Sequence, residues 1–206
     1  MTSKAALLIP INLPKVSGMN SRKSVAGVSV IALCAVTAAS IYSPPTPRLI
    51  YNKSESAPRG WYAIDPGGVV ERDRKVGAFA PVSARNLADS RGYLPHHIPL
   101  IKTVWATAGD EICELDGVVR TANRPDLLAL QKDSLGRDMP SWRGCIVLKN
   151  DEIFIVSTDV QTSFDSRYFG PVSKENVLGA ARFLGTTGEI LKDPVAAVGR
   201  ARGERK

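Results

Sequence analysis

The sequence has few of the residues on which common hydrolytic and metal centres depend. It contains two histidines, His96 and His97, and three cysteines in 206 residues. The histidines are adjacent and stand between Pro95 and Pro99, a context typical of a loop. No cluster of His, Cys and carboxylate residues has the spacing of metal ligands, and the glycine-rich phosphate-binding patterns are absent. We therefore expect no metal and no nucleotide cofactor.

A broad basic surface is also lacking, although the formal net charge is +7. Residues 1–23 carry four basic residues and no acidic one, and residues 191–206 carry five basic and two acidic residues. The two ends account for the whole net charge, so residues 24–190 are formally neutral. A neutral body does not offer the basic face that a phosphate backbone requires, which argues against a nucleic-acid partner.

Charged residues are missing altogether from one stretch, Ser24–Pro47. Its first part, Ser24–Tyr42, has 14 of 19 positions filled by Ala, Val, Ile, Leu, Cys or Tyr. Nineteen helical residues rise about 28 Å, close to the apolar thickness of a bilayer. We predict a transmembrane signal-anchor over residues 24–43. A cleaved signal peptide with small residues at 38–40 and a buried helix of a soluble protein are the alternatives.

The predicted anchor divides the chain into parts on two sides of a bacterial inner membrane. The basic residues 1–23 precede it and are expected in the cytoplasm, by the positive-inside tendency. Residues 44–190 then form a periplasmic domain, and residues 191–206 form a flexible basic tail.

Cysteine usage agrees with export. Cys34 lies inside the apolar stretch, and only Cys113 and Cys145 lie beyond it. Outside the cytoplasm an isolated pair is most simply interpreted as a disulfide, which stabilises a fold by roughly 3–4 kcal/mol on the chain-entropy estimate. Two separate buried thiols are the alternative.

Short β-rich runs separated by Gly, Pro, Asp and Asn fill the exported part, a spacing typical of a compact, mainly β domain with hairpins. The predicted strands are Val76–Val82, Ile98–Ala106, Ile112–Arg120, Cys145–Lys149 and Ile153–Ser157. The predicted short helices are Ser83–Arg91, Pro125–Lys132 and Lys174–Phe183.

Three segments contain residues suited to chemistry. In the first, Ser56 is followed by Pro58 and Gly60, so we expect it on a turn that exposes its hydroxyl. Ser54, two residues earlier, points to the same side if the segment is extended.

In the second segment Lys102 interrupts an apolar, strand-like run. Such a lysine lies either on a solvated face or buried, and burial would lower its pKa until the neutral amine becomes a general base near pH 7. In the third, Asp165 and Arg167 share a face of an extended segment, where they can pair, or they simply form a polar turn.

These three segments, in this order behind an apolar stretch, resemble the type I signal peptidases, most closely the TraF-like branch of conjugative-transfer peptidases. The serine motif is matched by Asn52, Ser54, Ser56, Pro58, Gly60 and Tyr62. The lysine motif is matched by Leu100, Lys102, Val104, Gly109 and Asp110. The third motif is matched by Ser163, Asp165, Ser166, Arg167, Gly170 and Val172. The resemblance extends to about Ala181.

The resemblance implies a serine endopeptidase with a Ser/Lys dyad, in a mainly β catalytic domain that lies against the membrane. Ser56 is the implied nucleophile and Lys102 its general base. Ser54 lends its hydroxyl, beside the backbone N–H of Ser56, to the oxyanion of the intermediate. The implied substrate is an exported precursor with small residues before the scissile bond.

The third motif implies support for the dyad. Ser163 orients the lysine, and Asp165 with Arg167 holds the segment in place. The sequence departs from housekeeping signal peptidases where Ser157-Thr158-Asp159 replaces their Gly-Asp-Asn-Arg stretch. This departure favours the specialised branch, whose members include enzymes that mature a pilin subunit and act beside other conjugation or type IV secretion components.

Three other functions are alternatives to a Ser/Lys peptidase. A Ser/His hydrolase would have to use His96 or His97. A LexA-like self-cleaving protein shares the Ser/Lys chemistry but needs a DNA-binding module where this sequence has its apolar stretch. A non-catalytic, disulfide-bonded scaffold of a secretion or conjugation apparatus explains the anchor and the cysteine pair, but not the matches around Ser56 and Lys102.

Overall fold

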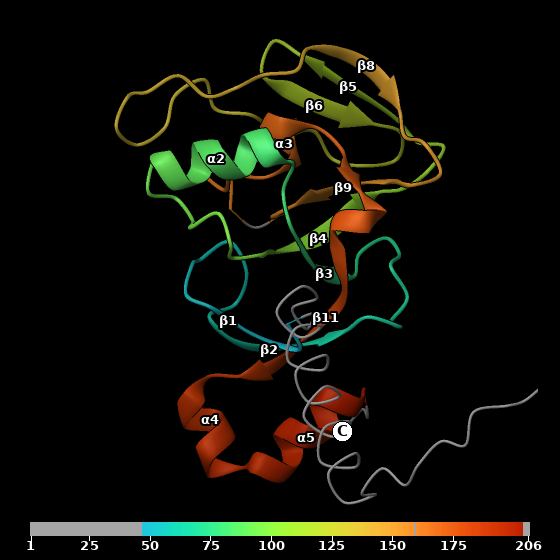
Figure 1. The fold of residues 1–206 in the computed structure, drawn as a ribbon. Helices are drawn as coiled ribbons and strands as arrows, with labels where there is room; N and C mark the ends of the chain where they lie inside the picture. The colour runs from blue at the N-terminus through green and yellow to red at the C-terminus, as the bar shows by residue number, and fades with distance from the viewer. Residues whose placement is uncertain (1–46, 159, 204–206) are drawn as a thin grey trace, which may run out of the picture. The chain divides into compact units, whose positions relative to one another are not determined.

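The computed structural model describes residues 47–158 and 160–203 of the chain. Over these residues the fold is mainly β with short helices, which confirms the predicted class (Figure 1). The strands are β1 (Leu49–Asn52), β2 (Gly60–Asp65), β3 (Lys75–Ala78), β4 (Leu100–Ala106), β5 (Glu111–Leu115), β6 (Val118–Thr121), β7 (Leu127–Leu128), β8 (Gly144–Val147), β9 (Glu152–Val156), β10 (Val172–Ser173) and β11 (Val177–Gly185). The helices are α2 (Val82–Ser90), α3 (Ser166–Phe169), the 3-10 turn η1 (Lys174–Asn176), α4 (Thr187–Lys192) and α5 (Pro194–Arg202).

The strands form two antiparallel sheets. The larger has seven strands in the order β1-β2-β11-β3-β4-β9-β10, and the smaller has four in the order β7-β6-β5-β8. In the smaller sheet Cys113 on β5 lies opposite Cys145 on β8, and the two form the predicted disulfide. The larger sheet carries the serine segment at β1–β2 and the lysine on β4.

The strand β4 contributes to all three clusters of the core, with one large residue in each. Ile101 packs beside Tyr62, Val104 belongs to the cluster around the centre of the larger sheet, and Trp105 contacts Phe154 in the cluster shared with the smaller sheet. Both faces of β4 are therefore covered. A polar side chain on this strand is enclosed unless it opens into a cavity.

The helix predicted over Pro125–Lys132 is wrong. Residues Leu127–Leu128 form the strand β7, which pairs with β6. The backbone N–H of Ala129 donates to the carbonyl of Gly117 at 2.8 Å, and that of Leu130 donates to the Tyr168 hydroxyl at 3.0 Å. These hydrogen bonds to other segments of the protein hold the backbone of residues 129 and 130 extended.

The helix predicted over Lys174–Phe183 is also wrong beyond its first turn. Only Lys174–Asn176 are helical, and β11 follows between β2 and β3. Gly179 has φ +144°, and a Cβ on it would lie 2.2 Å from the carbonyl oxygen of Asp65. A glycine here therefore lets the two backbones approach. The helix predicted over Ser83–Arg91 is confirmed by α2.

The C-terminal region was predicted as a flexible tail from residue 191, and the structure has α5 there. Ala197 on α5 is buried. Arg200 donates to the carbonyl of Leu184 at 2.8 Å, and Arg182 on β11 donates to the carbonyl of Ala201 at 2.9 Å. These contacts join α5 to the end of β11.

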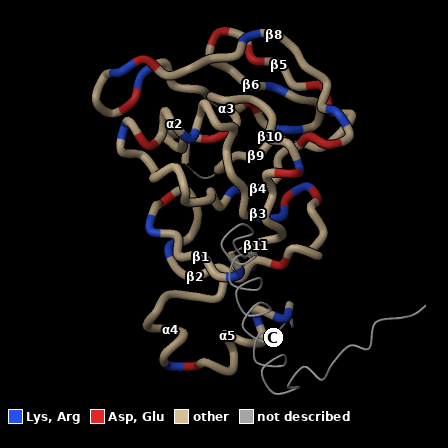
Figure 2. The backbone as a smooth tube through the Cα atoms, in the orientation of Figure 1, with Lys and Arg blue, Asp and Glu red and all other residues tan. Residues whose placement is uncertain are grey.

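Charged residues of both signs are intermixed along the loops around β5, β6 and β8 (Figure 2). Several form ion pairs between segments, such as Arg72 with Asp110 and Arg124 with Asp73. Among residues 47–158 and 160–203, no helix is long and apolar enough to span a bilayer. The predicted anchor, residues 24–43, lies outside these residues.

Candidate active site

Ser56 lies in the turn that joins β1 to β2, as its Pro and Gly neighbours predicted. Two side chains hold this turn. Asn52, at the end of β1, donates from Nδ2 to the carbonyl oxygens of Ala57 and Pro58 at 2.8 and 3.3 Å. The hydroxyl of Tyr62 on β2 donates to the Pro58 carbonyl at 3.0 Å, and burial raises the pKa of Tyr62 to about 12. The backbone around Ser56 is thus fixed from both strands of the hairpin.

The hydroxyls of Ser54 and Ser56 are in contact, with their Oγ atoms 2.8 Å apart. The turn brings them together, so the extended segment assumed in the sequence analysis is not needed. Ser54 Oγ also donates to Asn52 Oδ1 at 2.9 Å. A serine has one hydroxyl hydrogen. Since Ser54 gives its hydrogen to Asn52, the hydrogen of Ser56 points to Ser54 in this arrangement.

Lys102 is buried, with 3% of its surface exposed, so the solvated alternative is wrong. Its Nζ donates to Ser163 Oγ at 2.6 Å and to Ser157 Oγ at 3.0 Å. Both partners are hydroxyls, which are neutral and accept a hydrogen bond from the amine as well as from the ammonium. The lysine is therefore held in place without a direct carboxylate partner.

The environment of Lys102 lowers its pKa from 10.5 to about 8. Burial is the largest cause, because it removes the solvation of the ammonium. The negative charge of Asp165 opposes this effect, while the positive charges of Arg167 and Lys75 add to it. A substantial fraction of the amine is consequently neutral near pH 8, as a general base requires.

Asp165 and Arg167 form a buried ion pair at 2.8 Å, with 0% and 2% of their surfaces exposed. They do not share an extended segment: Asp165 caps α3 by accepting the backbone N–H of Arg167. Asp165 Oδ2 also accepts the backbone N–H of Ser157 at 2.9 Å, and Arg167 donates to the carbonyl of Val160 at 2.9 Å. Arg167 also donates to the Ser163 carbonyl at 3.4 Å, so the ion pair holds the backbone at both Ser157 and Ser163.

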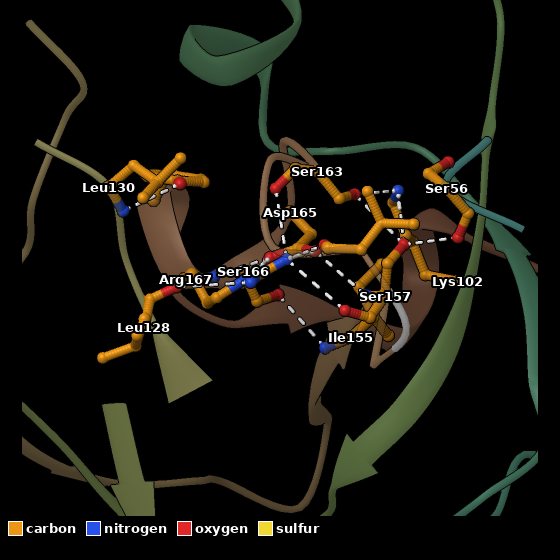
Figure 3. Close-up of polar contacts among 12 residues, drawn as sticks. Ser56, Lys102, Leu128, Leu130, Ile155, Ser157, Ser163, Asp165, Ser166 and Arg167 are labelled. Atoms are coloured by element: carbon orange, nitrogen blue, oxygen red, sulfur yellow. Dashed lines mark hydrogen bonds and ion pairs between the residues drawn. The ribbon is translucent and has the colours of Figure 1, made fainter. Parts of the chain in front are cut away.

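Ser157 is the residue that the sequence analysis missed. It is 4% exposed and lies between the lysine and the serine turn (Figure 3). Its Oγ donates to the backbone carbonyl of Ser56 at 2.6 Å and accepts from Lys102 and from Ser163. The sequence did indicate this position in one way: Ser157 is a polar residue directly after the apolar run of β9, where the Gly-Asp-Asn-Arg stretch of housekeeping signal peptidases is replaced.

Ser54, Ser56, Lys102 and Ser163 all line one cavity of about 720 Å³. The remaining wall has an apolar part and a polar part. The apolar part includes Leu94, Leu100, Leu130, Met139, Val160, Phe164 and Tyr168, and the polar part includes the charged residues Glu55, Arg59, Lys132 and Asp133. The histidines are exposed and are not part of this lining. Among the described residues, no group of three or more His, Cys, Asp or Glu side chains can hold a metal ion.

A buried lysine and a serine hydroxyl therefore line one cavity of a mainly β domain. The model of the signal peptidase family, peptidase S26, matches residues 21–185. The chain belongs to this family, and the predicted family is confirmed.

The relatives include conjugation proteins. A probable conjugal transfer protein TraF of Sinorhizobium fredii is 36% identical over 64% of this chain and 73% of its own length. A plasmid transfer protein TraF of Escherichia coli is 29% identical over 64% of this chain and 79% of its own length. A signal peptidase I structure from Enterococcus faecalis aligns with 53% of this chain and 94% of its own, at 17% identity and a TM-score of 0.31.

Proposed function

We propose that this chain is a membrane-anchored serine endopeptidase that removes the leader peptide from an exported precursor by a Ser/Lys dyad. The observation that carries the proposal is Lys102, a buried amine with a pKa of about 8 that lines the same cavity as the Ser56 hydroxyl. The apolar part of the cavity wall suits a hydrophobic leader segment. Residues 24–43 would anchor the enzyme in the inner membrane, with the catalytic domain from residue 44 in the periplasm.

In the proposed reaction Ser56 Oγ attacks the scissile carbonyl carbon while its hydrogen passes to the neutral Nζ of Lys102. The ammonium then gives the proton to the departing amine as the C–N bond breaks, and the acyl group remains on Ser56. Water, deprotonated by the same amine, hydrolyses this ester and restores the serine. Lys102 thus serves as base and then as acid in each half of the reaction.

The serine hydroxyls must turn for this chemistry. The Ser56 hydrogen, which points to Ser54 in the structure, would turn to the lysine lone pair. Ser54 would then turn its hydroxyl from Asn52 toward the oxyanion, beside the backbone N–H of Ser56. Losing one such donor typically costs about 10²–10³ in rate.

The relatives suggest the substrate. Both TraF proteins are named for plasmid or conjugal transfer, which favours a pilin precursor of a conjugation system, with small residues before the cleavage site, and neighbouring secretion components as partners. The alternative function, a non-catalytic scaffold of the same apparatus, predicts that no precursor is cut.

The test is to express the full chain with such a pilin precursor and follow the precursor's mass. Wild type should cleave, Ser56→Ala and Lys102→Met should not, and His96→Ala should cleave like wild type. Cleavage by Lys102→Met would contradict the dyad. If no variant cleaves and all are folded, the scaffold function is favoured. A product lighter than the hydrolysed pilin by one water would show that cleavage is coupled to cyclisation.

A further inference from the structure

We infer that Ser157 is a positioning residue of the dyad, whose hydroxyl orients the lone pair of Lys102 and ties the nucleophile's backbone to the base. This inference rests on the proposed function. Ser157 follows β9, the strand that pairs with the lysine's strand β4. Its hydroxyl connects the lysine strand and the serine turn by hydrogen bonds, and these two segments are far apart in the sequence (Figure 3).

The direction of each hydrogen bond follows from counting hydrogens. The carbonyl of Ser56 only accepts, so the single hydroxyl hydrogen of Ser157 goes to it, over 2.6 Å. Ser157 Oγ must therefore accept from Lys102 Nζ at 3.0 Å and from Ser163 Oγ at 3.1 Å. Ser163, which gives its own hydrogen to Ser157, must likewise accept from the lysine at 2.6 Å.

This hydrogen-bonding pattern determines how the neutral amine of Lys102 is oriented. A neutral amine has two hydrogens and one lone pair, and the two serine oxygens take both hydrogens. The lone pair is then the only part of Nζ left for the Ser56 hydroxyl, with which it shares a cavity. With Ser163 alone, the amine could turn about its Cε–Nζ bond and direct a hydrogen at the nucleophile, an arrangement that cannot accept its proton.

The second contact of Ser157 sets the position of the nucleophile. Its bond to the Ser56 carbonyl acts on the backbone of the reacting residue itself, whereas the bonds from Asn52 and Tyr62 reach the carbonyls of residues 57 and 58. Ser157 is fixed in turn, because its backbone N–H donates to the fully buried Asp165. The ion pair of Asp165 and Arg167 thereby reaches Ser56 through a single hydroxyl.

The decisive comparison is Ser157→Thr against Ser157→Val, which have nearly the same shape and differ by the hydroxyl. We expect kcat of the Val variant, and of Ser157→Ala, to fall by about 10- to 100-fold, the range for a misplaced reacting group, with little change in KM. The Thr variant should retain most of the activity. Ser141→Ala, which removes a serine bound to Glu114 in the smaller sheet, is the matched control and should behave as wild type.

A second readout does not depend on cleavage. The charged groups that act on Lys102 are Asp165, Arg167 and Lys75, and all remain in these variants. An ammonium binds an acceptor more strongly than an amine does, so loss of the Ser157 hydroxyl should lower the Lys102 pKa further. An NMR titration of the Lys102 side chain in the full chain should show the lower pKa in Ser157→Val and an unchanged pKa in Ser157→Thr.

The outcomes separate the two proposals. Equal kcat and equal titration of the Thr and Val variants would overturn the role of Ser157, even with an active wild type. If the wild type cleaves no precursor but the titrations differ as expected, the geometry of the amine holds and the proposed function fails.

Discussion

Among the described residues, each of the two sheets buries one side chain of the Lys, Arg, Asp and Glu group almost completely, and the effect on its pKa differs between the sheets. Lys102 in the larger sheet is 3% exposed, and Glu114 in the smaller sheet is 2% exposed. The amine of Lys102 donates its hydrogen bonds to two serine hydroxyls, and its pKa is lowered to about 8. Glu114 accepts from the backbone N–H groups of Gly117 and Arg143 and from the Ser141 hydroxyl, at 3.0, 2.9 and 2.6 Å.

The hydrogen-bond partners of the two side chains account for the difference in their pKa shifts. Burial alone would raise the pKa of Glu114, but the hydrogen bonds and the charge of Arg143 outweigh it, so the pKa lies below its ordinary value. Glu114 is thus kept ionised and holds together the loops beside the disulfide. At Lys102 the effect of burial is larger than that of its partners, so its charge state changes near pH 8. A buried carboxylate whose oxygens accept several hydrogen bonds stays ionised and stabilises the fold. A buried amine that has only neutral acceptors can lose its proton, as a general base must.

The largest expected effect comes from removing the buried amine. Its folded pKa of about 8 lies below the unfolded value of 10.5, so below pH 8 the charged amine costs the fold roughly 3 kcal/mol. This cost disappears as the pH rises from 8 to 10.5, because the unfolded chain binds more protons in that window. Lys102→Met should therefore raise the free energy of unfolding at pH 7 by up to about 2 kcal/mol, after the loss of two hydrogen bonds.

Urea unfolding of the full chain in detergent at pH 7 and pH 10.5 would measure this gain. Lys149→Met, which replaces an exposed lysine that does not act on the Lys102 pKa, is the control. A Lys102→Met variant less stable than wild type at pH 7 would contradict the comparison between the sheets.

Glu114→Gln should act in the opposite direction. The amide group of glutamine turns a donor toward at least one of the three donors that now face the carboxylate, so we expect a loss of about 2 kcal/mol at pH 7. Because the folded pKa of Glu114 is lowered, its stabilisation is present above the unfolded value of 4.5 and is lost as the pH falls through the folded pKa. Thermal unfolding at pH 7 and pH 3 should show the gap between variant and wild type closing in acid.

The pH dependence of cleavage tests the same comparison through activity instead of stability. With Lys102 as the base, kcat/KM should fall about tenfold per pH unit below its pKa of about 8 and level off above it. Glu114→Gln should show the same profile, since Glu114 titrates at much lower pH. Initial rates from pH 6 to 9 on a peptide spanning the cleavage site would test this, and a flat profile would exclude Lys102 as the titrating base.

Local features of the site could be predicted from the sequence. Pro58 and Gly60 indicate the turn at Ser56, and the order of the three motifs indicates the family. Burial of Lys102 was one of two alternatives, because a strand with both faces covered is a property of the whole sheet. The pairing of Cys113 with Cys145 could be named only because no other cysteine lies beyond the apolar stretch.

Non-local features escaped prediction. The strand β11 contains two glycines and two alanines, which by themselves do not favour a strand, and it extends only because β2 and β3 pair with it on both sides. Ser157 has only a weak local signal, a polar residue directly after the apolar run of β9. Its importance arises from a contact with Ser56, 101 residues earlier in the chain.

The position of β11 also has a consequence for the order of folding. The strands β2 and β3 are consecutive in the chain but are not neighbours in the sheet, because β11 lies between them. The hairpin with Ser56 and the strand with Lys102 therefore become parts of one sheet only when residues 177–185 have folded between β2 and β3. A chain without this segment in place would carry Ser56 and Lys102 on separate pieces of structure, so under the proposed function it would not cleave a precursor.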